Sequence, residues 1–183
     1  AAVDVLTGDV NPSGKLAETF PLKLSDTSCY RYFPEGPVTV EYRESIYVGY
    51  RYYDTAHTEV LFPFGHGLSY TQFAYRDMTL SADRIRDDET LDVAVTIENT
   101  GERAGAEIVE LYVRDDESTI FRPEKELKGF AKVYLEPGEN KTVSFTLDKR
   151  SFAYYNVDSH GWHVQSGTFT VMAGSSSASI LLT

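Results

Sequence analysis

The stretch Leu91-Asp92-Val93-Ala94-Val95-Thr96-Ile97-Glu98 alternates large apolar residues with small or polar ones. Successive side chains of a β-strand point to opposite faces of the sheet, so this period of two predicts a strand with one buried and one exposed face. The same period recurs in residues 109–113, 143–147 and 169–173. These periods do not fit helices, and they predict a chain that is mainly β.

Turn residues separate these segments at the spacing of a β-sandwich. Residues that supply the backbone angles of turns stand at Asn99-Thr100-Gly101, Glu136-Pro137-Gly138-Glu139, Ser159-His160-Gly161 and Ser166-Gly167. We therefore predict a sandwich of about seven strands between residues 71 and 183. Residues 148–156, which contain three aromatic side chains, are predicted to form a short helical turn that crosses between the sheets.

The first seventy residues are rich in Pro, Gly and Tyr but show no sustained periodicity. Such a segment is too long for a plain loop between strands, so we expect an extended arm that lies on another surface. Residues 1–8 are predicted to be the last turns of a helix that ends at Gly8, and residues 15–20 a short strand before Pro21. Neither element could bury its apolar side chains alone.

Composition excludes several classes of protein. The 183 residues include 17 Lys and Arg against 28 Asp and Glu, a net charge of -11 that disfavours nucleic acids and anionic membranes as partners but not a neutral sugar. No apolar run approaches the ~18 residues that cross a bilayer and no signal pattern is present, so we expect a soluble chain of unassigned compartment. The single cysteine, Cys29, excludes an internal disulfide and a thiolate-rich zinc site.

Convincing catalytic or metal-ligating residues are lacking. The four histidines have neither the i, i+4 helical spacing nor the paired cysteines of a transition-metal site, so we expect no metal and no cofactor. The acidic runs Asp87-Asp88-Glu89 and Asp115-Asp116-Glu117 stand beside turns or strand ends, without the regular spacing of calcium ligands. We interpret both runs as solvated loop tips.

The arm carries a cluster of aromatic and basic residues that has two interpretations. The cluster consists of Tyr42, Arg43, Tyr47, Tyr50, Arg51, Tyr52 and Tyr53. Tyrosine rings with polar tips suit carbohydrate binding, and they equally suit packing between domains, which we favour because a free patch of this size would be unusual on a monomer. His66, between Gly65 and Gly67, is interpreted as a clamp where the backbone passes close to another surface, with direct sugar contact as the alternative.

Two segments of the arm are more specific. Gly8-Asp9-Val10-Asn11-Pro12-Ser13-Gly14-Lys15-Leu16, followed by Thr19-Phe20-Pro21, and Tyr47-Val48-Gly49-Tyr50-Arg51-Tyr52-Tyr53-Asp54, leading to Phe62-Pro63-Phe64-Gly65-His66-Gly67-Leu68-Ser69-Tyr70-Thr71, closely resemble the C-terminal part of glycoside hydrolase family 3, of the β-glucosidase type. The resemblance continues through Asn99-Thr100-Gly101 and Leu135-Glu136-Pro137-Gly138-Glu139. It covers nearly the whole chain.

The resemblance implies a domain organisation. Members of this family combine a catalytic (β/α)8 barrel, an α/β sandwich domain and a fibronectin type III-like domain. By that analogy residues 1–22 are the tail end of the α/β sandwich domain, residues 23–70 an extended interdomain connector, and residues 71–183 the fibronectin type III-like (immunoglobulin-like) domain. The expected partners are the missing barrel and α/β sandwich domains, in the same polypeptide or a separate chain.

The resemblance also implies an activity for the parent protein. Family members hydrolyse terminal β-D-glucosyl residues with retention, which needs an ionised and a protonated carboxyl group about 5–5.5 Å apart. Neither the barrel segment with the nucleophilic Asp nor the loop with the acid/base Glu is present, so we assign no catalytic residue. The chain is expected to be an inactive, supporting portion of a β-glucosidase that acts on β-glucosides or oligosaccharides. Tyr47, Tyr50, Arg51, Tyr52, Tyr53 and His66 are the candidate interdomain or active-site-rim residues.

Three alternatives stay open. The parent could be a β-xylosidase of the same family, because specificity resides in the absent pocket. The chain could also be a stand-alone carbohydrate-binding module, or a plain scaffold domain. The scaffold is disfavoured because a free sandwich has no use for the arm segment Asn11-Pro12-Ser13-Gly14-Lys15-Leu16.

Overall fold

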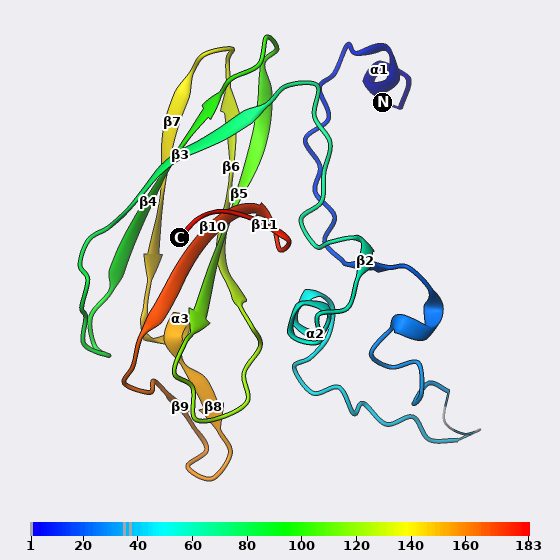
Figure 1. Cartoon of the computed structure of the whole chain (residues 1–183), viewed down its shortest axis with the longest axis vertical. Helices are drawn as coiled ribbons and strands as arrows, with labels where there is room; N and C mark the ends of the chain where they lie inside the picture. Colours follow the sequence, from blue (N-terminus) through cyan, green and yellow to red (C-terminus); the bar gives the residue numbers. More distant parts are fainter. Residues whose placement is uncertain (1, 35, 37) are drawn as a thin grey trace.

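A computed structural model describes residues 2–34, 36 and 38–183. Within them, seven antiparallel strands form two packed sheets, with the order β11-β10-β5-β6 in one and β3-β4-β7 in the other (Figure 1). The strands are β3 (Phe73–Leu80), β4 (Leu91–Asn99), β5 (Gly105–Asp115), β6 (Glu126–Leu135), β7 (Asn140–Leu147), β10 (Phe169–Ser176) and β11 (Ser179–Leu182). The predicted mainly β fold with a seven-stranded sandwich is confirmed.

The core lies between the two sheets and follows the predicted alternation. Along β4 the apolar residues Val93, Val95 and Ile97 have no exposed surface, and Val109 and Leu111 of β5 meet them from the opposite sheet. Full burial of one such side chain contributes about 1.5–3 kcal/mol to folding, so these residues decide which face of each strand turns inward.

A buried asparagine closes one end of the sandwich. Asn99, at the predicted turn after β4, accepts a hydrogen bond from Thr71 Oγ1 (2.6 Å) and donates to the carbonyl of Leu135 (3.1 Å) and to that of Arg103 (2.7 Å). These bonds satisfy its buried amide and tie the turn to β6. In the next predicted turn, Gly138 has a φ of +75°, which favours glycine.

The helical turn predicted for residues 148–156 is only partly correct. The helix α3 (Lys149–Phe152) is present, and the Asp148 side chain caps it by accepting a hydrogen bond from the Ser151 amide. Tyr154–Asn156 instead form strand β8, which pairs with β9 (Gly161–His163) in a hairpin that extends from the sandwich (Figure 1). The aromatic residues of this hairpin favour a strand because their rings pack across it, as Tyr155 and Trp162 do at 5.3 Å.

The arm contains short elements only. Helix α1 (Ala2–Thr7) ends at Gly8, whose φ is +83°, as predicted. The predicted strand over residues 15–20 is wrong, because strand β1 covers only Phe20–Pro21 and pairs with β2 (Val60–Phe62). Residue 16 makes two isolated backbone hydrogen bonds instead, from the Leu16 amide to the His66 carbonyl (2.9 Å) and from the Gly65 amide to the Leu16 carbonyl (2.8 Å).

Two further elements of the arm were not predicted. They are a 3-10 turn, η1 (Leu24–Asp26), and helix α2 (Tyr50–Thr55). Figure 1 shows the arm beside the four-stranded sheet, away from the three-stranded one. The arm therefore covers the outer face of that sheet, and Glu110 and Tyr112 of β5, which alternation alone would expose, are 3% and 0% exposed.

Candidate interdomain site

The arm approaches the four-stranded sheet most closely at Gly65. This residue has a φ of +82°, and a Cβ atom placed on it would lie 2.5 Å from both carboxylate oxygens of Glu110 and 2.7 Å from Ser176 Cα. Real Cβ atoms do not tolerate such distances, so only glycine fits between the arm and the sheet here. The neighbouring Phe64 carbonyl accepts a hydrogen bond from the Ser177 amide at 2.9 Å, which fixes the same stretch to the end of β10.

A buried ion pair joins the arm to β5. Lys15 Nζ lies 2.8 Å from Glu107 Oε1, and both side chains are largely buried. The same Nζ donates to the carbonyl of Ser175 at 3.1 Å, so the ammonium group bridges β5 and β10. Removal of either charge would leave the other buried without its partner, which is strongly destabilising.

Glu110 lies beneath the arm and has an unusual acidity. Its carboxylate accepts a hydrogen bond from Tyr112 Oη at 2.5 Å. Burial raises the pKa of Glu110 from its ordinary value of 4.5 to about 7, an effect that the Tyr112 hydrogen bond and the positive charge of Lys15 only partly oppose. Burial also raises the pKa of the Tyr112 hydroxyl, so that group stays a proton donor to Glu110.

Helix α2 places one of the predicted tyrosines, Tyr50, against the sheet and buries a second, Tyr53. The Tyr50 ring packs at 5.8 Å from the Tyr112 ring and at 5.0 Å from the Phe64 ring, and its hydroxyl accepts a hydrogen bond from the Leu127 amide at 2.7 Å. Tyr53 is 6% exposed. These rings are therefore packed inside the chain and do not form a flat, exposed platform for a sugar.

Charged residues hold the same helix at its edges. Lys125 Nζ lies 2.9 Å from Asp54 Oδ2, and Arg51 lies 3.6 Å from Glu126 Oε1. Glu126 also pairs with Arg122 at 2.9 Å. Burial alone would raise the pKa of Glu126, but the positive charges around it prevail and hold that pKa below its ordinary value. The carboxylate therefore stays ionised and keeps its partners.

The remaining predicted residues lie around this contact. Tyr47 stacks on Phe121 at 4.9 Å and donates from its hydroxyl to the Phe121 carbonyl, while Tyr52 packs edge-on against Tyr53 at 5.1 Å. The His66 imidazole packs on Phe62 at 4.8 Å and makes no hydrogen bond to any described residue, so its backbone carbonyl supplies the contact within the arm. The structure thus places Tyr47 near Glu126, the partner of Arg51, and Tyr52 against Tyr53, whereas the His66 ring packs on Phe62 within the arm.

Sequence reasoning missed Asn11 as a residue of this site. Its Nδ2 donates to the Ala104 carbonyl at 2.9 Å, and its Oδ1 accepts from Ser69 Oγ at 3.0 Å and from the Tyr70 amide at 2.9 Å. Asn11 thereby ties the two ends of the arm to the start of β5. Its place in the Asn11-Pro12-Ser13-Gly14-Lys15-Leu16 motif was the signal that could have identified it.

The outer side of the arm is apolar and uncovered. Large side chains there are exposed by between 63% and 92%: Leu6, Val3, Leu24, Phe33, Val38, Tyr42 and Leu68. So many exposed large apolar side chains on one segment suit contact with a further protein surface. The arm therefore packs on the sandwich through some residues and leaves other large apolar side chains exposed.

Two other kinds of site were sought in the part of the chain that the structure describes. No group of three His, Cys, Asp or Glu side chains there is arranged to hold a metal ion. No helix in that part is both long and apolar enough to cross a bilayer.

Comparison with known families assigns both parts of the chain. The model of the glycosyl hydrolase family 3 C-terminal domain matches residues 1–70, and that of the fibronectin type III-like domain matches residues 107–177.

Relatives match the chain from end to end. The thermostable beta-glucosidase B of Acetivibrio thermocellus is 58% identical over all of this chain and 24% of its own length. An exo-alpha-(1->6)-L-arabinopyranosidase of Bifidobacterium breve is 43% identical over 98% of this chain and 23% of its own length. The crystal structure of a Bifidobacterium adolescentis GH3 beta-glucosidase superposes with a TM-score of 0.92 at 41% identity, over 98% of this chain and 26% of the other. The chain thus spans about a quarter of the length of the proteins it matches.

Proposed function

This chain belongs to the C-terminal region of glycoside hydrolase family 3, and from that premise we propose that it is the noncatalytic portion of a retaining, exo-acting β-glucosidase. The parent enzyme would hydrolyse terminal β-D-glucosyl residues of β-glucosides or oligosaccharides. One observation carries the proposal: a relative named as a beta-glucosidase is 58% identical along this entire chain.

The proposed role of the chain is structural support. Residues 1–22 would complete an α/β sandwich domain, residues 23–70 would connect that domain to the rest, and residues 71–183 would form the fibronectin type III-like domain. The apolar outer side of the arm supports this division, because it needs a partner surface that the sandwich does not provide. The proposed partners are the barrel and α/β sandwich domains of the same enzyme.

The proposed site residues act by positioning this arm. Tyr50 and Arg51 fix helix α2 on the sheet and the buried Tyr53 packs on Tyr52, so the segment on either side of α2 is presented to the catalytic domains in one orientation. Tyr47, Tyr52 and His66 would contact those domains or the rim of their active site. Retention requires two carboxyl groups at close range around the sugar, and we place both on the parts of the enzyme outside this chain.

One of the relatives supports a second substrate specificity for the parent enzyme. The arabinopyranosidase of Bifidobacterium breve is 43% identical to this chain, so a very similar C-terminal region serves an enzyme with a different named substrate. The parent could therefore be another exo-glycosidase, such as a β-xylosidase, with the same role for this chain.

A chimera tests the proposal. The segment of the Acetivibrio thermocellus enzyme that corresponds to this chain is replaced by residues 1–183, and hydrolysis of aryl β-D-glucopyranoside is measured. We expect the glucosidase activity of the parent to be restored, whereas the same enzyme without the segment should be inactive.

A second chimera, carrying residues 71–183 alone, is the matched control. If the arm positions the catalytic domains, this control should fold poorly or lose activity. A scaffold domain would behave differently, since the chimera with the full chain would then be as inactive as the enzyme without it, and that result would refute the proposal.

A further inference from the structure

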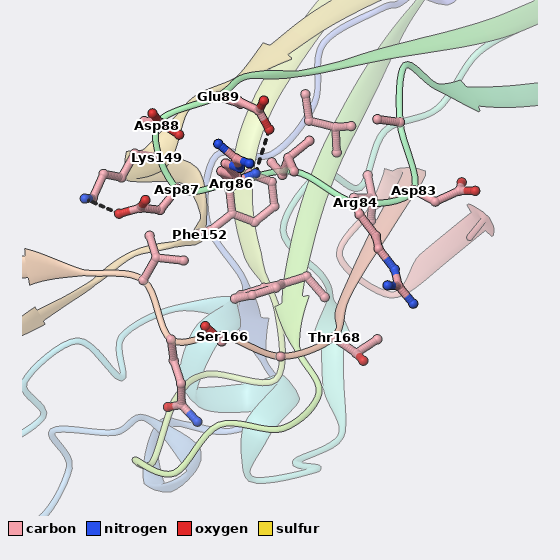
Figure 2. A pocket seen from close by; sticks show the side chains of 18 of the residues that line it. Asp83, Arg84, Arg86, Asp87, Asp88, Glu89, Lys149, Phe152, Ser166 and Thr168 are labelled. Carbon is pink, nitrogen blue, oxygen red and sulfur yellow. Dashed lines mark hydrogen bonds and ion pairs between the residues drawn. The ribbon is translucent and has the colours of Figure 1, made fainter.

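A cavity of about 1180 Å³ opens at one end of the sandwich (Figure 2). Three segments enclose it, namely the loop between β3 and β4, helix α3, and the residues that lead into β10. Figure 1 shows the β3–β4 loop on the side of the sandwich that faces away from the arm. The cavity is therefore separate from the candidate interdomain site.

The floor of the cavity is apolar. It consists of the open end of the core, where Leu91, Phe152 and Val171 are almost completely buried. Ile85 and Val164 extend this floor toward the mouth and are only half-buried. A ligand that enters can thus place C–H groups against aliphatic and aromatic carbon, as ligands of most binding cavities do.

The mouth carries charges of both signs. Lys149 Nζ pairs with Asp87 Oδ2 at 2.6 Å, and the Glu89 carboxylate accepts a hydrogen bond from the Arg86 amide at 2.7 Å. The hydrogen bond from Lys149 lowers the pKa of Asp87, so this pair stays ionised. The acidic run that the sequence places at a solvated loop tip therefore borders a cavity.

Four charged groups at the mouth have unused hydrogen-bonding capacity. The guanidinium groups of Arg84 and Arg86 and the carboxylates of Asp83 and Asp88 make no hydrogen bond or ion pair to any described residue. The guanidinium groups only donate and the carboxylates only accept. Two donors, Arg84 and Arg86, thus stand between two acceptors, Asp83 and Asp88, on one short loop.

We infer that this cavity is a binding site for a neutral saccharide. An anionic ligand would meet the four carboxylates of the loop, and a cationic ligand would meet Arg84, Arg86 and Lys149. An uncharged sugar avoids both penalties. Its hydroxyl groups can accept from the guanidinium groups and donate to the carboxylates, while its C–H faces lie on Ile85 and Val164.

The class of saccharide rests on the proposed function. For a β-glucosidase, the ligand is a β-linked gluco-oligosaccharide held outside the active site. Binding there would keep a second stretch of substrate close to the enzyme and raise its local concentration.

The test is a titration of the 183-residue chain with cellotetraose, followed by amide chemical shifts in NMR spectra. We expect saturable shifts confined to residues 81–89 and 149–168. The double variant Arg84→Ala/Arg86→Ala should bind about tenfold more weakly or worse. Arg76→Ala is the matched control, because Arg76 lies on β3 outside the cavity and pairs with Glu98, and its affinity should equal that of the parent chain.

A second variant fills the cavity and keeps its charges. Ala82→Trp places a large ring among the lining residues, and it should abolish the shifts. The inference is wrong if cellotetraose gives no saturable shift up to about 10 mM, if the shifts map to the arm, or if the double variant binds like the parent. If a variant fails to fold, the parent chain alone tests the inference, which requires the shifts to map to residues 81–89 and 149–168. The glucosidase chimera is an independent test, so failure to bind here would leave the proposed function standing.

Discussion

Gly65 shows how a single residue sets the distance between the arm and the sheet. Replacement by Ala adds a Cβ 2.5 Å from the Glu110 carboxylate oxygens at a φ of +82°. We expect Gly65→Ala to lower the free energy of unfolding by about 2–3 kcal/mol, because overpacking and left-handed strain act together. Urea unfolding of the full chain measures this loss.

Gly138→Ala is the control for Gly65→Ala. Gly138 has a similar φ of +75°, but a Cβ on it would meet no atom within 4 Å. Its replacement should cost only the strain, about 1 kcal/mol. Equal losses for the two variants would mean that close packing on Glu110 is not what requires glycine at position 65.

Glu110 should make the stability of the chain depend on pH. Its pKa is raised in the folded chain from 4.5 to about 7, because burial disfavours the ionised carboxylate. The contribution of the protonated Glu110 to the free energy of unfolding is therefore full below pH 4.5 and is lost as pH rises through 7. Glu110→Gln should therefore unfold with nearly the same free energy as the parent at pH 4.5, and be more stable than it by about 1–3 kcal/mol at pH 8.

The exposed residue Glu59 offers a control for this measurement. Glu59→Gln removes a carboxylate that lies in solvent, so the difference from the parent should stay near zero at both pH values. If Glu110→Gln shows the same flat difference, the carboxyl of Glu110 is not perturbed by burial under the arm.

Among the elements, helix α2 depends on one hydroxyl group. Tyr50→Phe keeps the ring contacts but removes the acceptor of the Leu127 amide at 2.7 Å, so we expect a loss of about 1–2 kcal/mol in the free energy of unfolding. The hydroxyl of Tyr52 bonds to no described residue, and Tyr52→Phe should change that free energy by less than about 0.5 kcal/mol. Indistinguishable denaturation curves for the two variants would contradict this role of α2.

Elements with a clear period could be predicted, and elements that depend on a neighbouring surface could not. The burial of Val93 and Val95 follows from alternation alone. Helix α2 has six residues, too few for a helical period, and it is held by the packing of Tyr50 against the sheet.

The same distinction applies to the candidate site. The Tyr-rich run pointed to Tyr50 and Tyr53, whereas nothing local indicates that Lys15 and Glu107, far apart in the sequence, form an ion pair. Alternation assigns Glu110 to solvent, and only the presence of the arm reverses that assignment.

At the scale of the whole molecule, the uncovered side of the arm should make the isolated chain associate with itself. Apolar side chains such as Leu6, Leu24 and Leu68 are 73% to 81% exposed. We expect the sedimentation coefficient to rise with protein concentration, and the triple variant with Ser at these three positions to remain monomeric.

A matched triple variant separates the arm from the sandwich in this experiment. Phe130, Val157 and Leu181 are also exposed, at 70%, 70% and 48%, but they lie outside the arm, on β6, in the β8–β9 turn and on β11. Their replacement by Ser should leave the association intact. Association that disappears in this variant and persists in the other would place the adhesive surface on the sandwich.

The position of β5 has a kinetic consequence. Its residues Val109 and Leu111 face the core, and Glu110 and Tyr112 face the arm, so neither face of the strand touches water. Backbone amides of such a strand exchange their hydrogens for deuterium only when a protein opens. In β5 that opening must displace the arm as well as the second sheet, so deuterium uptake along this one strand would report, over hours, how firmly the arm is held.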